Sequence, residues 1–134
     1  MVRVLVMDDD PAIRSWLRTV LEDQHYEVLE APDGKVGLRL FQERPPDVVI
    51  LDVLMPEKEG IETLLELRKE CPEVKVIMIS GGSFRVTTQE ALSAAGDFGA
   101  LRTLAKPFSC EDLLDAIAAV LSLSGEQTLR SLLL

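Results

Sequence analysis

Short apolar runs alternate with amphipathic stretches along almost the whole chain, and this rhythm restricts the fold more than any other feature of the sequence. The apolar runs have the length of strands, whereas the stretches between them place apolar residues at helical spacing. Strands are predicted at residues 2–7, 27–31, 48–51, 74–79 and 101–105. Strands that alternate with helices form a parallel sheet, and almost wholly apolar strands are typical of a sheet covered by helices on both faces.

Turn and capping residues predict where the helices begin and end. Asp10 is expected to cap the first helix with Pro11 at its first position, and this helix should end near Gln24. Ser109 is expected to cap the last helix, because Asp112 stands where a capping box needs an acceptor. The other helices are expected between the turn at Asp33 and Gly34 and the pair Pro45 and Pro46, after Gly60 with Ile61, Leu64, Leu65 and Leu67 as apolar positions, and at residues 87–95.

Length and charge limit the classes of protein to consider. A chain of 134 residues fits one domain, expected at residues 1–121, followed at 122–134 by a tail or the start of a linker. The formal net charge of −9 argues against direct binding to nucleic acid or membranes and favours a metal ion or a basic protein partner. No apolar run approaches the ~18–20 residues that cross a bilayer, and no signal-peptide layout opens the chain, which predicts a cytoplasmic location.

Polar residues follow four of the predicted strands at the point where each strand ends. Asp8 and Asp9 follow the first, Asp52 the third, Ser80 the fourth and Lys106 the fifth. Right-handed crossovers bring the carboxyl ends of parallel strands to one edge of the sheet. In a doubly wound α/β sheet of order 2-1-3-4-5, strands one and three are neighbours at the switch point, where ligands bind. The sequence therefore predicts that these five side chains converge on one crevice.

Such a cluster of carboxylates requires a cation. Two carboxylates about 4 Å apart repel by roughly 4 kcal/mol at an effective dielectric constant of about 20. Only oxygen ligands are on offer, which favours a hard ion such as Mg²⁺, and Mg²⁺ with open positions suits phosphoryl transfer. We expect Asp52 to be the nucleophile, with the ammonium of Lys106 and the hydroxyl of Ser80 binding phosphoryl oxygens.

Each residue taken singly has a plainer interpretation. Asp8 and Asp10 are of a type that caps helices, and Asp10 most simply does only that. Ser80 alone is a turn residue, and Lys106 alone is a solvated charge. The four strand ends taken together are hard to explain in this way, because caps and turns have no reason to match the switch point.

Four segments of the sequence carry a resemblance to a known family: VLVMDDD at residues 4–10, ILDVLMP at 50–56, ISG at 79–81 and KPF at 106–108. In this order they resemble the receiver domain of response regulators in two-component signalling, of the chemotaxis-regulator type with a flavodoxin-like fold. The resemblance covers about residues 2–121.

The resemblance implies specific roles. Asp52 would accept a phosphoryl group from a histidine kinase or phosphotransfer protein. Asp9, Asp52 and the backbone carbonyl of Leu54 would ligate Mg²⁺, with Asp8 acting mainly through water. Lys106 and Ser80 would hold the phosphoryl oxygens, and the bond between Lys106 and Pro107 would be cis.

Two features depart from the family pattern. Thr103 stands where the family usually has the aromatic residue that reports phosphorylation to partners. Leu54 and Gly82 stand where family members tune dephosphorylation, and neither side chain can orient an attacking water. The resemblance therefore implies a regulatory phosphoacceptor with slow self-dephosphorylation and an unusual read-out.

Two other functions compete with this interpretation. A phosphohydrolase of the haloacid-dehalogenase type also forms an aspartyl phosphate with Mg²⁺, but its nucleophile follows the first strand. A pseudo-receiver would bind partners without phosphorylation, against which the intact acidic and lysine positions argue.

The tail leaves the assembly of the protein open. Leu129, Leu132 and Leu133 would share one helical face, which fits a homodimer seam, a linker to an output domain or a frayed terminus. The chain is thus either a stand-alone receiver that acts on a downstream protein or part of a larger regulator.

Overall fold

The computed structural model describes residues 1–53, 60–80 and 100–123. Strands and helices alternate within these ranges. Their order along the chain is β1 (Arg3–Met7), α1 (Pro11–Asp23), β2 (Glu27–Ala31), α2 (Gly34–Glu43), β3 (Val48–Asp52), α3 (Gly60–Glu70), β4 (Val76–Ser80), β5 (Arg102–Ala105) and α5 (Cys110–Leu121).

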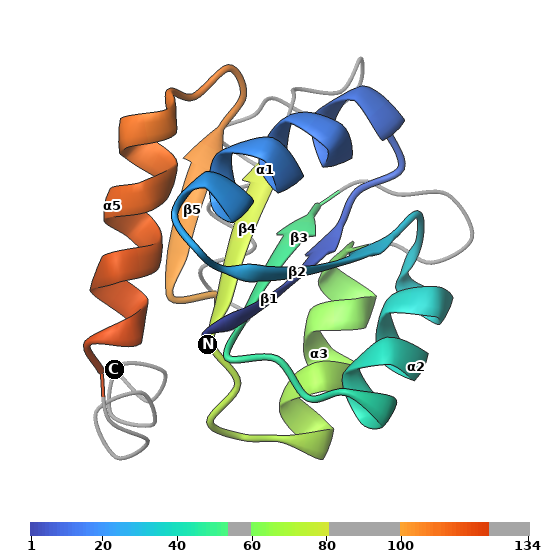
Figure 1. The fold of residues 1–134 in the computed structure, drawn as a ribbon. Helices are drawn as coiled ribbons and strands as arrows, with labels where there is room; N and C mark the ends of the chain where they lie inside the picture. The colour runs from blue at the N-terminus through green and yellow to red at the C-terminus, as the bar shows by residue number, and fades with distance from the viewer. Residues whose placement is uncertain (54–59, 81–99, 124–134) are drawn as a thin grey trace.

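The five strands form one parallel sheet in the order β2-β1-β3-β4-β5. Helices cover both of its faces, with α1 and α5 on one side and α2 and α3 on the other (Figure 1). This is the doubly wound α/β architecture that the alternating sequence predicts. The reversal of winding puts β1 beside β3, which is where such sheets bind ligands.

Alternation within each strand divides the core into two layers. In β1 and β3, odd-numbered residues such as Leu5 and Leu51 pack with Phe41 of α2 and with α3, and in β4 the even-numbered residue Met78 joins this layer. The residues between them, such as Val6 and Ile50 of β1 and β3 and Ile77 of β4, pack with α1 and α5. The central strands β3 and β4 are buried at every position, which explains why their sequences are apolar without alternation.

The capping predictions for α1 and α5 are confirmed, and α2 has a cap at the residue that was expected only as part of a turn. Asp10 caps α1 by accepting from the backbone N–H of Ala12, and Asp33 caps α2. Ser109 and Asp112 form the capping box of α5. Gln24 is the C-cap of α1, as expected.

Two expectations need correction. The fourth strand begins at Val76, not Val74, because the N–H of Val74 bonds to the carbonyl of Cys71 in the turn after α3. Leu65 was expected on the buried face of the third helix but is 45% exposed, because a step of one residue turns a side chain by about 100° from its buried neighbour Leu64. The expected helix at 87–95 lies outside the described residues.

Across the part of the chain that the structure describes, no helix combines the length and apolar character needed to cross a membrane.

Candidate functional site

The carboxyl ends of the strands place the predicted residues at one edge of the sheet. Asp8 directly follows β1, Asp52 is the last residue of β3, and Ser80 is the last residue of β4. The backbone N–H of Lys106 donates to the carbonyl of Ser80 over 2.7 Å, so the start of the loop after β5 is fixed to the end of β4. The peptide bond between Lys106 and Pro107 is cis, as the resemblance implied.

Three carboxylates meet at this edge. Asp8, Asp9 and Asp52 each offer an oxygen, and these oxygens all lie within 4.8 Å of one another. Asp8 is fully buried, Asp52 is 5% exposed, and Asp9 is exposed. Two buried carboxylates so close together are unfavourable unless a cation or hydrogen-bond donors compensate them.

The ammonium of Lys106 supplies part of that compensation. Its Nζ lies 2.9 Å from Oδ2 of Asp8 and 3.5 Å from Oδ2 of Asp52. Burial alone lowers the pKa of Lys106, but the hydrogen bond to Asp8 and the charges of Asp52 and Asp8 outweigh it, so the pKa is raised. Lys106 is therefore charged at neutral pH and lies within reach of any anionic group bound to Asp52.

The donor set also fits a divalent ion. Oxygens around an octahedral Mg²⁺ lie about 3–4 Å apart, and the oxygens of this cluster all lie within 4.8 Å of one another. Carboxylate oxygens are the ligands that Mg²⁺ prefers, and the exposed Asp9 leaves the cluster open on one side. The three carboxylates can thus hold a hard divalent cation beside Lys106.

The structure brings four of the predicted residues into one cluster: Asp8, Asp9, Asp52 and Lys106. Ser80 is buried at the end of the adjacent strand, at the same edge. Leu54, whose carbonyl was expected as a metal ligand, lies outside the described residues.

Sequence reasoning missed Arg14. Its Nη1 donates to the backbone carbonyl of Asp8 over 2.6 Å. Arg14 lies one turn inside α1, and long helical side chains point toward the helix N-terminus, so this reach was readable in principle. Its position on a polar helix face gave no hint of the carbonyl that it meets.

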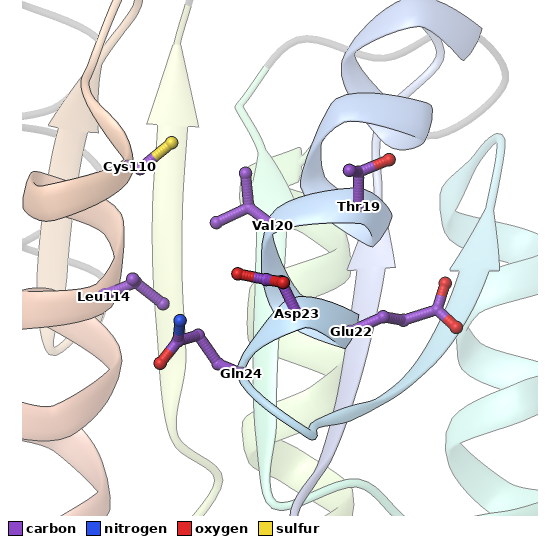
Figure 2. A pocket seen from close by; sticks show the side chains of 7 residues that line it. All are labelled: Thr19, Val20, Glu22, Asp23, Gln24, Cys110 and Leu114. Atoms are coloured by element: carbon purple, nitrogen blue, oxygen red, sulfur yellow. The ribbon is translucent and has the colours of Figure 1, made fainter.

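A separate depression lies away from the carboxylates, between α1 and α5. Its volume is about 550 Å³. Figure 2 shows Val20 and Gln24 on one side of it and Cys110 and Leu114 on the other. Its lining residues include two carboxylates, Glu22 and Asp23, and no basic side chain, so it is not suited to a phosphoryl group. Cys110 and Cys71 are free thiols.

Comparison with known proteins agrees with this geometry. A family model described as the response regulator receiver domain matches residues 4–118. The response regulator MprA of Mycolicibacterium vanbaalenii is 38% identical over 120 residues, which are 90% of this chain and 50% of that protein. The chain therefore spans about half the length of MprA.

Other relatives match over nearly their whole length. The chemotaxis protein CheY of Listeria monocytogenes is 32% identical over 119 residues, which cover 87% of this chain and 96% of that protein. The crystal structure of the receiver domain of NtrX from Brucella abortus superposes with a TM-score of 0.84 at 31% identity, covering 90% of this chain and 99% of that one. The motifs, the strand order, the acidic edge and these matches agree, and the chain belongs to the family of response-regulator receiver domains.

Proposed function

We propose that this domain is a phosphoacceptor switch of a two-component system, in which Asp52 takes a phosphoryl group from a histidine kinase or a phosphotransfer protein. The observation that carries the proposal is the position of Lys106, whose ammonium contacts the carboxylates of Asp8 and Asp52 at the switch point of the sheet. A cation fixed beside a nucleophilic carboxylate is what the transfer of a phosphoryl group needs.

The transfer step follows from the chemistry of the carboxylate. One oxygen of Asp52 bonds to phosphorus while the bond from phosphorus to the imidazole nitrogen of the donor breaks, and that nitrogen keeps the electron pair. Lys106 and Ser80 bind the phosphoryl oxygens, Lys106 through its charge and Ser80 through its hydroxyl. As Lys106 turns toward the new phosphoryl group, its contact with Asp8 weakens, which couples the chemistry to the arrangement of the loop.

Asp8, Asp9 and Asp52, with the carbonyl of Leu54, are the proposed ligands of Mg²⁺, Asp8 acting mainly through water. When bound, Mg²⁺ neutralises negative charge on the transferred group and on the carboxylates around it. The support for this assignment is the spacing of the three carboxylates and their oxygen chemistry.

The domain is proposed to span residues 1–121, with 122–134 as a tail or linker. Its downstream partner is either a separate protein or an output domain, and a homodimer is part of the proposal. Binding to nucleic acid or membranes by this domain is not expected, given a net charge of −9. A cytoplasmic location is part of the proposal.

The decisive experiment is intact mass after incubation with Mg²⁺ and a small acyl phosphate. Wild type should gain one phosphoryl group, and Asp52→Asn should gain none. Asp10→Asn is a matched control, because it removes a carboxylate from the same acidic run but keeps the cap on Ala12, which asparagine also provides. Phosphorylation of Asp52→Asn would remove Asp52 from the mechanism.

The same material tests the rival functions. A phosphohydrolase would turn over a generic phosphate ester with Mg²⁺, whereas a phosphoacceptor would stop after one phosphoryl group. A pseudo-receiver would take up none. Leu54 and Gly82 lie outside the described residues, but neither side chain can orient a water, so slow self-dephosphorylation is part of the proposal. A half-life of seconds would contradict that part.

A further inference from the structure

Asp8 is held at every polar atom. Its N–H donates to the carbonyl of Ala31 over 3.1 Å, and its Oδ1 accepts from the N–H of Asp10 over 2.9 Å. Its Oδ2 accepts from Lys106, as described above. The remaining atom, the backbone carbonyl, accepts from Arg14. The first three contacts follow from the sheet, the turn and the proposed chemistry, but the fourth has no role in the mechanism.

Arg14 is itself held by the edge strand. Its Nε lies 3.4 Å from Oε1 of Glu30 in β2, and the other carboxylate oxygen, Oε2, accepts from Nε of Arg18 over 2.5 Å. Arg18 also donates to the carbonyl of Val28 and pairs with Glu22. Glu30 thus forms ion pairs with two arginines from successive turns of α1. Of these two, only Arg14 contacts the acidic loop at residues 8–10.

We propose that Arg14 is a positioning residue for the acidic loop: by holding the carbonyl of Asp8, it fixes the direction in which Asp9 presents its carboxylate to a divalent ion. This inference rests on the proposed function, because it assigns a role in holding the Mg²⁺ that phosphoryl transfer needs.

The physical basis is the planarity of the peptide bond. The carbonyl of Asp8 lies in one peptide plane with the N–H and the Cα of Asp9. A donor that fixes the carbonyl therefore also fixes the orientation of the backbone from which the side chain of Asp9 extends. The bond from Arg14 is short and charge-assisted, and its donor is anchored by Glu30 at the other end. Asp9 is exposed, so packing alone does not restrain its side chain in the way that burial restrains Asp8.

The sign of the effect separates this role from simple electrostatics. A guanidinium near three carboxylates repels a divalent cation, so its charge alone would weaken metal binding, and its removal would strengthen it. A positioning role predicts the opposite. Groups that orient metal ligands without touching the metal change affinity by about 10- to 100-fold when mutated.

The test is calorimetric titration of the full chain with MgCl₂, together with thermal unfolding of each variant. Arg14→Met should bind Mg²⁺ about 10-fold more weakly than wild type. Arg18→Met is the matched control, because it removes the same charge from the same helix and the same partner Glu30, yet it does not touch Asp8. It should keep an affinity close to that of wild type while losing at least as much thermal stability. Arg14→Lys, which retains a donor but not the fork, should lie between wild type and Arg14→Met.

The outcomes are distinct. Equal or tighter Mg²⁺ binding by Arg14→Met, or an equal loss in Arg18→Met, would overturn the positioning role and leave the proposed function intact. A wild-type protein that does not bind Mg²⁺ would overturn both.

Discussion

Lys106 is the residue on which two buried carboxylates depend for a compensating charge. Asp8 is fully buried and Asp52 nearly so, while the side chain of Lys106 retains 18% of its exposure. Replacement by methionine keeps the length of the side chain but leaves the carboxylates facing each other. We expect Lys106→Met to lower the free energy of unfolding by about 3 kcal/mol in urea denaturation without divalent ions, as for other broken buried pairs.

The same variant should respond to Mg²⁺ more strongly than wild type, because the ion would then be the main cation in the cluster. Lys35→Met is the control, since Lys35 is exposed on α2 and its loss should change stability by less than about 0.5 kcal/mol. Equal stability of Lys106→Met and Lys35→Met would show that the carboxylates do not need the lysine.

At the scale of residues, the sequence predicts which side chains meet because their strands end at the same edge of the sheet. It does not predict contacts that depend on how far a long side chain extends. Asp8, Asp52 and Lys106 were predicted together because parallel strands end at one edge. Arg14 was missed because it contacts a backbone carbonyl. Every residue has one, so the sequence does not indicate which carbonyl a side chain will contact. Leu65 was placed in the core because its apolar character was read without the turn of the helix, which exposes it.

At the scale of elements, α5 depends on its N-terminal cap. The hydroxyl of Ser109 accepts from the N–H of Asp112 over 3.0 Å, and the carboxylate of Asp112 accepts from the N–H of Ser109 over 3.3 Å. Ser109→Ala removes the first bond and should lower the free energy of unfolding by about 1 kcal/mol in urea denaturation.

Ser122→Ala is the companion variant at the other end of α5. Its hydroxyl donates to the carbonyl of Ala119 and is exposed, so water replaces the lost bond and the loss should stay below about 0.5 kcal/mol. If both serine variants lowered the free energy of unfolding by the same amount, the capping box would contribute no more to stability than an exposed hydrogen bond at the other end of α5.

The edge strand β2 is tied to its surroundings by Glu27, which contacts Arg3 of β1 and Arg44 beyond α2. The hydrogen bond from Arg3, aided by the charges of Arg3 and Arg44, outweighs desolvation and lowers the pKa of Glu27 from its ordinary value of 4.5. A lowered pKa in the folded state means that the carboxylate stabilises the fold above pH 4.5 and that this contribution is lost as the pH falls further.

Glu27→Gln should therefore melt at a lower temperature than wild type at pH 7, and the difference should shrink as the pH falls below 4.5. Melting curves across this range measure it. Glu43→Gln, at the end of α2, controls for the loss of one negative charge. A difference between wild type and Glu27→Gln that persists unchanged in acid would contradict the ion-pair explanation.

Element boundaries were predictable where a side chain marks them and less so where the backbone decides. The starts of three helices are marked by Asp10, Asp33 and Ser109. Each of these side chains accepts a hydrogen bond from a backbone N–H in the first turn, which has no partner within the helix. The start of β4 carries no such mark. Val74 is as apolar as the strand that follows, and only its turn contact with Cys71 excludes it from the ladder.

At the scale of the whole molecule, an excess of negative charge and a cluster of carboxylates act together. Alternating apolar runs were enough to predict a parallel sheet covered by helices, whereas the strand order that the structure shows was expected from the flavodoxin-like resemblance. The charge of −9 was assigned from composition alone, but its effect on stability depends on where the carboxylates lie. Those that are scattered respond to any salt, whereas those that converge respond to an ion that fits between them.

Mg²⁺ should consequently stabilise the folded protein by mass action. A ligand that binds only the folded state at about 100 times its dissociation constant adds about 2.7 kcal/mol. We expect the melting temperature to rise in MgCl₂ and to rise much less in NaCl of equal ionic strength. NaCl only screens the charges, whereas Mg²⁺ also binds at the carboxylate cluster. Asp9→Asn should abolish the specific part while leaving the fold nearly unchanged, since Asp9 is exposed. An equal shift in both salts, or in both proteins, would mean that the carboxylate cluster binds no divalent ion and that the charge acts only as a diffuse field.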